Sequence, residues 1–147
     1  ISAWELIERC DAYPPEKVSI AMSLFYAEWI KRFGPSEKVE RVLNSVMVEF
    51  NSQKRGGAGY SEVGTKITDA SFSGLTMTPG FIWVKVKEDP RLICETSFVH
   101  ELVHIGIWAL KGTDGDPDHL GQVYYGWTTR HSMLIQDVNQ HLCRLGI

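Results

Sequence analysis

The chain has 147 residues, of which 44% are hydrophobic and 22% charged, and its formal net charge is −3 at pH 7. These values are ordinary for a globular protein with a sizeable core, so they exclude an intrinsically disordered chain and predict a single domain over residues 1–147. The acidic balance gives no support to a nucleic-acid partner, and no apolar run reaches the roughly 18 residues of a membrane-spanning helix.

Three helices are predicted in the first third of the chain. A short one is expected from the capping-box pair Ser2 and Glu5 up to Pro14. A second helix ends at Gly34, and a third begins at the N-cap Ser36. The residues that these two helices turn inward are apolar and mostly spaced by three or four: Val18, Met22, Phe25, Trp29, Phe33, Val39, Val42, Leu43, Val46 and Phe50.

The residues between 51 and 80 predict a small β-meander rather than further helix. Glycines, serines and threonines interrupt short segments of β-favouring residues there. The clearest strand follows in the sequence FIWVKV, residues 81–86, because Ile82 and Val84 alternate with Phe81 and Trp83.

The longest predicted helix begins at the N-cap Asp89, carries Pro90 in the first turn, where proline is tolerated, and ends at Gly112. A polar, turn-rich loop follows it. Thr128 or Thr129 is expected to cap a last helix. One face of this last helix carries His131, Ile135, Val138 and Leu142.

The sequence HELVH lies in the middle of the longest helix. Residues four apart stand one turn above each other, so His100 and His104 point from one face with a separation that one zinc ion can bridge. Glu101 is rotated by roughly 100° from His100 and can reach a metal-bound water instead. Zinc lowers the pKa of such a water towards about 7, and the carboxylate can take its proton and pass it to a leaving amine.

The residues around this motif are apolar: Phe98, Val99, Leu102, Val103 and Ile105. Burying two imidazoles and a carboxylate among such neighbours costs free energy unless these groups are paired or coordinate an ion. We therefore favour a metal site over a surface helix with incidental histidines.

A catalytic zinc needs a third protein ligand, and the sequence leaves two histidines open. His119 lies in the loop after the metal helix, beside Asp118, which could orient its ring. His131 is the alternative, because it opens the last helix on the apolar face. Tyr124 or Tyr125 could donate a hydrogen bond to a tetrahedral oxyanion, or simply pack in the interior.

The three cysteines, Cys10, Cys94 and Cys143, are far apart and form no CxxC pair. We therefore expect neither a disulfide framework nor a cysteine zinc ribbon, and we expect Cys10 and Cys94 to behave as small apolar residues on helices. With reduced cysteines and no recognisable signal peptide, a cytoplasmic location is predicted.

The sequence HELVHIGIWALKGTDGDPDHLG, residues 100–121, resembles the SprT-like zinc metallopeptidases, the group that includes the Spartan-type proteases. That family has an HExxH helix, an aromatic residue four positions on, a glycine near the helix end, and a loop that delivers a third histidine. Trp108 matches the aromatic residue and Gly112 the glycine, and His119 follows His104 by fifteen residues. Upstream, the order of helices and then strands is also similar.

The resemblance implies an α+β, zincin-like fold with N-terminal helices, a small β-meander with an edge strand, the HExxH helix and a C-terminal helix. It implies that zinc is bound by three histidines, His100, His104 and His119, and that Glu101 activates water. It also implies that a peptide substrate pairs with the edge strand by β-augmentation. The edge-strand residues would be Ile82, Trp83 and Val84.

The chain departs from the family where Leu120 stands between the third histidine and Gly121, and residues 1–147 include neither a zinc ribbon nor a basic tail. The family's association with DNA-bound proteins is therefore not transferred. The function predicted is a zinc-dependent metallopeptidase acting on protein or peptide. The alternatives are a non-catalytic zinc-binding module that retains the fold and a zinc hydrolase that acts on a non-protein amide.

Overall fold

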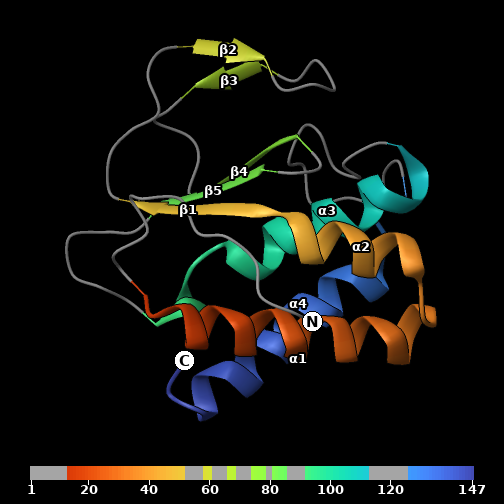
Figure 1. Cartoon of the computed structure of the whole chain (residues 1–147), viewed down its shortest axis with the longest axis vertical. Helices are drawn as coiled ribbons and strands as arrows, with labels where there is room; N and C mark the ends of the chain where they lie inside the picture. The colour runs from red at the N-terminus through yellow and green to blue at the C-terminus, as the bar shows by residue number, and fades with distance from the viewer. Residues whose placement is uncertain are drawn as a thin grey trace.

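The computed structural model describes residues 13–51, 58–60, 66–68, 74–78, 81–85, 92–112 and 126–147. This part of the chain is mostly helical. Its elements, in chain order, are α1 (Pro15–Phe33), α2 (Glu37–Ser45), β1 (Met47–Asn51), β2 (Ala58–Tyr60), β3 (Lys66–Thr68), β4 (Gly74–Thr78), β5 (Phe81–Lys85), the 3-10 helix η2 (Ile93–Glu95), α3 (Phe98–Lys111) and α4 (Thr129–Arg144). Figure 1 shows the helices gathered on one side of a three-stranded sheet, with the β2–β3 pair on the other side.

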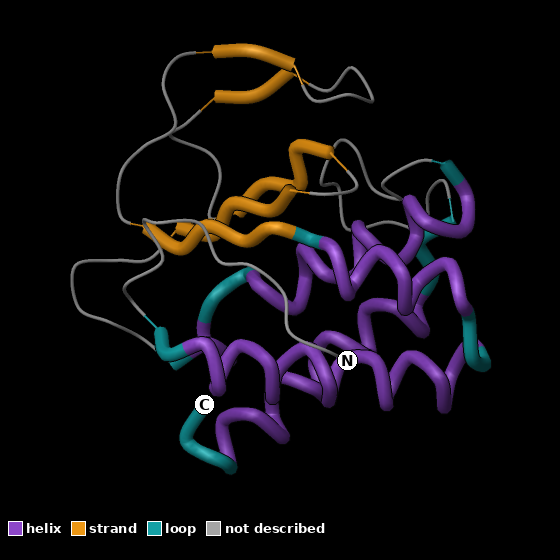
Figure 2. The backbone as a smooth tube through the Cα atoms, in the orientation of Figure 1, coloured by secondary structure: helices purple, strands orange, loops and turns teal. Residues whose placement is uncertain are grey.

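The three-stranded sheet has the order β1-β5-β4. β1 runs parallel to β5, with Val48 opposite Ile82, and β4 runs antiparallel to β5, with Thr76 opposite Ile82. β2 and β3 form a separate antiparallel pair, which Figure 2 shows apart from the sheet. The three-stranded sheet is not a simple meander, because β1 and β5 are parallel and are not consecutive in the chain.

The expectation that residues 81–86 form an edge strand is wrong. β5 lies in the middle of the sheet, and the backbone at Ile82, Trp83 and Val84 is paired with β1 on one side and with β4 on the other. Alternation along a strand reports its two faces and not its lateral neighbours, so the sequence pattern could not show this. The outer strands are β1 and β4, and β4 contacts α3.

Several helix boundaries agree with the sequence, and two do not. Ser36 caps α2 by accepting a hydrogen bond from the Val39 N–H at 3.3 Å, and Thr128 is the N-cap of α4. The third helix, however, ends at Ser45, because Val46, Val48 and Phe50 are buried at every second position, which is the period of a strand and not of a helix. The metal helix begins at Phe98 after η2, not at Asp89, which lies outside the described residues.

The core forms where α1, α3 and α4 meet beneath the sheet. Its largest fully buried side chains are Trp29, Phe25, Phe50, Phe98, Met22, Leu43, Ile82, Ile93, Leu102, Ile105 and Ile107. α1 packs tightly on α3 where the indole of Trp29 lies over Gly106: a Cβ atom on Gly106 would stand 2.7 Å from Cη2 of Trp29. Only glycine fits at this point of the metal helix without a shift of that indole.

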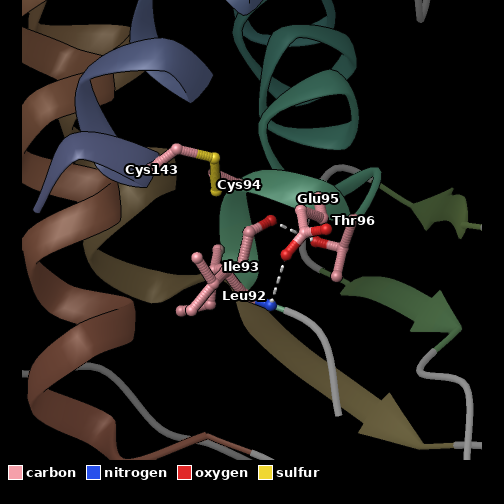
Figure 3. The surroundings of a disulfide bond; sticks show 6 residues. All are labelled: Leu92, Ile93, Cys94, Glu95, Thr96 and Cys143. Carbon is pink, nitrogen blue, oxygen red and sulfur yellow. Dashed lines mark hydrogen bonds between the residues drawn. A yellow bond between two sulfur atoms is a disulfide. The ribbon is translucent and has the colours of Figure 1, made fainter. Parts of the chain in front are cut away.

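A disulfide joins Cys94 of η2 to Cys143 near the end of α4, with 5.5 Å between their Cα atoms (Figure 3). The Cys94 N–H also donates to the carbonyl of Ile147 at 3.2 Å. The expectation that Cys94 is an unpaired apolar residue is therefore wrong, because the return of α4 past η2 brings together two residues 49 positions apart. Cys10 lies outside the described residues, and the cytoplasmic location stays a prediction without the support of reduced cysteines.

Within the described ranges, no helix is both long enough and apolar enough to cross a membrane.

Replacing Cys143 with serine is expected to lower the free energy of unfolding by about 4 kcal/mol, because the bond closes a loop of about fifty residues in the unfolded chain. Chemical denaturation of the wild type and the variant measures this. A reductant should bring the wild type to the stability of the variant and leave the variant unchanged. The unfolded, unreduced wild type should show one free thiol, and three would contradict the bond.

Candidate metal centre

The middle of α3 presents three polar side chains in an otherwise apolar helix. Glu101 is 2% exposed and His104 is 1% exposed, while His100 is half-buried. The helix is closed by Gly112, whose φ of 77° is the left-handed conformation that glycine adopts readily and whose N–H donates to the Trp108 carbonyl at 3.0 Å. The spacing predicted from HELVH is therefore realised in one regular helix.

The two imidazoles converge on a common point. The Nε2 atoms of His100 and His104 lie 3.1 Å apart, and the ring planes are inclined at 73°. Two nitrogens that each lie 2.0–2.1 Å from a tetrahedral zinc ion are about 3.3 Å apart, so this separation suits two zinc ligands. The histidine pair is placed as a metal site requires.

The carboxylate of Glu101 belongs to the same group. Potential ligand atoms of His100, Glu101 and His104 all lie within 4.8 Å of one another, and this is the one such group of three in the described part of the chain. A buried carboxylate costs free energy unless its charge is compensated, and a cation held by the two imidazoles would compensate it. The residues present therefore fit a divalent metal ion.

The sequence offers two candidates for the third ligand, His119 and His131. The structure describes only His131. His119 lies in residues 113–125, outside the described part, together with Asp118, Tyr124 and Tyr125. Its role and the oxyanion role of a tyrosine stay predictions.

His131 is not brought to the pair. Its side chain is 6% exposed, and its Nδ1 atom lies 3.0 Å from the Thr128 N–H, which donates to it in the capping box of α4. The ring stacks on Phe33, with 4.3 Å between ring centroids. It does not belong to the group of ligand atoms formed around His100 and Glu101. In this structure His131 is a helix-capping and packing residue.

Trp127 contacts the rings of both candidate ligands and also lies near His131. Its indole centroid lies 5.1 Å from the ring of His100, 5.0 Å from that of His104 and 6.1 Å from that of His131. No functional role was predicted for Trp127 from the sequence. The sequence gives little indication of a role for this residue, because Trp127 precedes the last helix and does not belong to the periodic apolar pattern of a helix or a strand.

Burial lowers the pKa of His131 from its usual 6.5 to about 4, and the positive charge of Arg130 adds to this effect. The folded chain therefore binds fewer protons than the unfolded chain between these two pH values. The contribution of the neutral His131 side chain to the free energy of unfolding should be fully present above pH 6.5. It should be lost as the pH drops from 6.5 to 4, and the loss should amount to about 3 kcal/mol. Denaturation of the wild type and of His131→Gln across this range measures the effect. An equal pH dependence in both chains would contradict the burial of a neutral imidazole.

The chain matches no family model, and neither a curated protein nor a solved structure matches it.

Proposed function

We propose that this chain is a zinc-dependent metallopeptidase of the SprT-like type, in which His100 and His104 hold the ion and Glu101 is the general base and then the general acid. The observation that carries the proposal is the 3.1 Å convergence of two Nε2 atoms beside a buried carboxylate on one helix. A purely structural zinc site has no need of a base at this position.

A bound zinc ion would supply a Lewis acid that polarises the scissile carbonyl and eases the ionisation of a water molecule. The chain's own residues supply the rest. The imidazoles of His100 and His104 would offer their Nε2 lone pairs to the ion. Glu101 accepts the proton of the attacking water and delivers it to the leaving amine.

His119 is the third ligand in this proposal. The segment 113–125 leaves α3 at Gly112 and rejoins the described chain at Gly126, which packs beside Ile107 and Lys111 of the same helix. Both ends of the segment that carries His119 are thus fixed next to the metal helix. His131 is a weaker candidate for the third ligand, because its Nδ1 atom already accepts a hydrogen bond from the Thr128 N–H at the start of α4.

We further propose that an extended peptide substrate pairs with β4 rather than with β5. β4 is an outer strand of the three-stranded sheet, runs antiparallel to β5 and contacts α3. An outer strand offers unpaired backbone groups to an added strand, whereas β5 has neighbours on both sides. This choice keeps the β-augmentation inferred from the family resemblance and moves it to a different strand.

Substituting Glu101 with glutamine should lower kcat/KM on a denatured protein substrate by about 10²-fold to 10⁴-fold while one zinc ion per chain is retained, because the base is lost and the two imidazoles remain. Elemental mass spectrometry and a cleavage assay measure the two properties. Glu37→Gln, on the exposed first turn of α2, is the matched control and should leave both unchanged.

Zinc retained without cleavage in the wild type would instead favour the non-catalytic zinc-binding module. Wild-type cleavage that survives Glu101→Gln would contradict the assigned role of the carboxylate.

Proline on β4 separates a peptidase from a hydrolase of small amides. Successive residues of a strand direct their N–H groups to opposite edges, so one of Leu75 and Thr76 points its N–H towards β5 and the other points it outward. Leu75→Pro and Thr76→Pro should therefore differ. The variant that removes the N–H directed at β5 should have a lower free energy of unfolding, and the variant that removes the outward N–H should keep its stability but lose most of its proteolytic activity. Thermal unfolding and cleavage of a protein and of a small amide measure this. Full proteolysis by the stable variant would contradict docking on β4.

A further inference from the structure

One indole ring packs against both candidate metal ligands. Trp127 is 3% exposed, and its ring plane is inclined by 43° to the imidazole of His100 and by 47° to that of His104. Both centroid distances are close to 5 Å, so the indole is in contact with each ring. Within the described part of the chain, it is the side chain outside α3 with ring contacts to both histidines.

Trp127 is itself held from two sides. Its Nε1–H donates to Oγ of Ser132, on the first turn of α4, at 2.9 Å. The preceding residue, Gly126, has a φ of 99°, and a Cβ atom there would stand 3.3 Å from Ile107 and 3.2 Å from Lys111. The backbone at Gly126 thus packs against the second half of α3, while the indole of Trp127 is hydrogen-bonded to α4.

An imidazole on a helix can rotate about its outer side-chain torsion, and each such freedom lost on metal binding costs affinity. A bulky ring fixed beside both imidazoles removes part of that freedom before any ion binds. It also keeps water from one side of the pair, which strengthens electrostatic interactions there.

We propose that Trp127 is a positioning residue of the metal centre: its buried indole, anchored by Ser132, holds the rings of His100 and His104 so that their Nε2 atoms converge. This inference rests on the proposed metal site and adds to it a residue that is not a ligand. It also assigns to the first turn of α4 a part in metal binding that does not involve His131 as a ligand.

The test compares Trp127→Ala, Ser132→Ala and the matched control Trp29→Phe. Trp29 is another buried tryptophan that packs on α3, but over Gly106 and not over the histidines. Zinc affinity is measured by competition with a chromophoric chelator. The visible absorption of the Co²⁺-loaded protein reports coordination geometry. Proton NMR of the metal-free protein reports the imidazole ring resonances.

Trp127→Ala is expected to weaken zinc binding by about 10-fold to 100-fold, the range seen for residues that orient metal ligands, and to alter the Co²⁺ spectrum. Ser132→Ala should weaken binding less. The ring resonances of His100 and His104 should move in Trp127→Ala, while those of exposed His141 stay in place. Trp29→Phe should lower stability without changing zinc affinity.

Equal zinc affinity in the wild type and Trp127→Ala would overturn the positioning role and leave the metal site standing. Equal losses in Trp127→Ala and Trp29→Phe would also overturn it, because the effect would then be general destabilisation. A wild type that takes up no zinc would overturn the metal site, and the positioning role with it. The variants and the wild type therefore report the two failures separately.

Discussion

The close approach of α1 to α3 at Trp29 and Gly106 is the steric constraint on which the packing of the helical core depends. Glycine inside a helix costs about 1 kcal/mol relative to alanine, so its presence here needs a reason. The reason is steric, because any Cβ atom would collide with the indole ring. The same indole lies against the rings of Phe25, Phe33 and His131, so α1, α3 and α4 all meet at this one side chain.

Both ends of α4 are linked to the first half of α3 or to the segment before it. Its C-terminal turn is joined through Cys143 to Cys94, four residues before α3 begins, and its N-terminal turn carries the serine that anchors Trp127. The disulfide restrains η2, which precedes α3. The indole of Trp127 packs on the turn of α3 that carries His100 and His104. Such restraint would lower the reorganisation that the proposed metal binding requires.

The local features of this fold were readable from the sequence, and the long-range features were not. The cap at Ser36 and the four-residue spacing of His100 and His104 depend on neighbours in the chain, so they were predicted and appear in the structure. The central position of β5 depends on pairing with β1, more than thirty residues away, and the disulfide depends on how α4 docks. Neither leaves a periodic trace in the sequence.

His131 shows the same limit within the candidate site itself. Its place on the apolar face of α4 correctly predicted burial, but burial did not distinguish a ligand from a packing residue. The distinction depends on which partner its ring nitrogen meets, and that partner is the backbone of Thr128, three residues earlier. A histidine at this position of a helix can close a capping box, which is a local alternative that the spacing of His131 from Thr128 already contained.

Two of the three buried polar or charged residues in the described part of the chain, Glu101 and His104, lie on α3, and the third is His131. Phe98, Val99, Leu102, Val103 and Ile105 surround the motif and are fully buried, so leucine at the positions of His104 and Glu101 would satisfy packing alone. Each buried polar group instead carries a desolvation cost of a few kcal/mol, unless it is compensated. Local rules are broken most often at functional sites. His100, Glu101 and His104 break the apolar pattern together, on one helix, with two nitrogens at the separation of metal ligands, and this grouping is what supports the proposed metal centre.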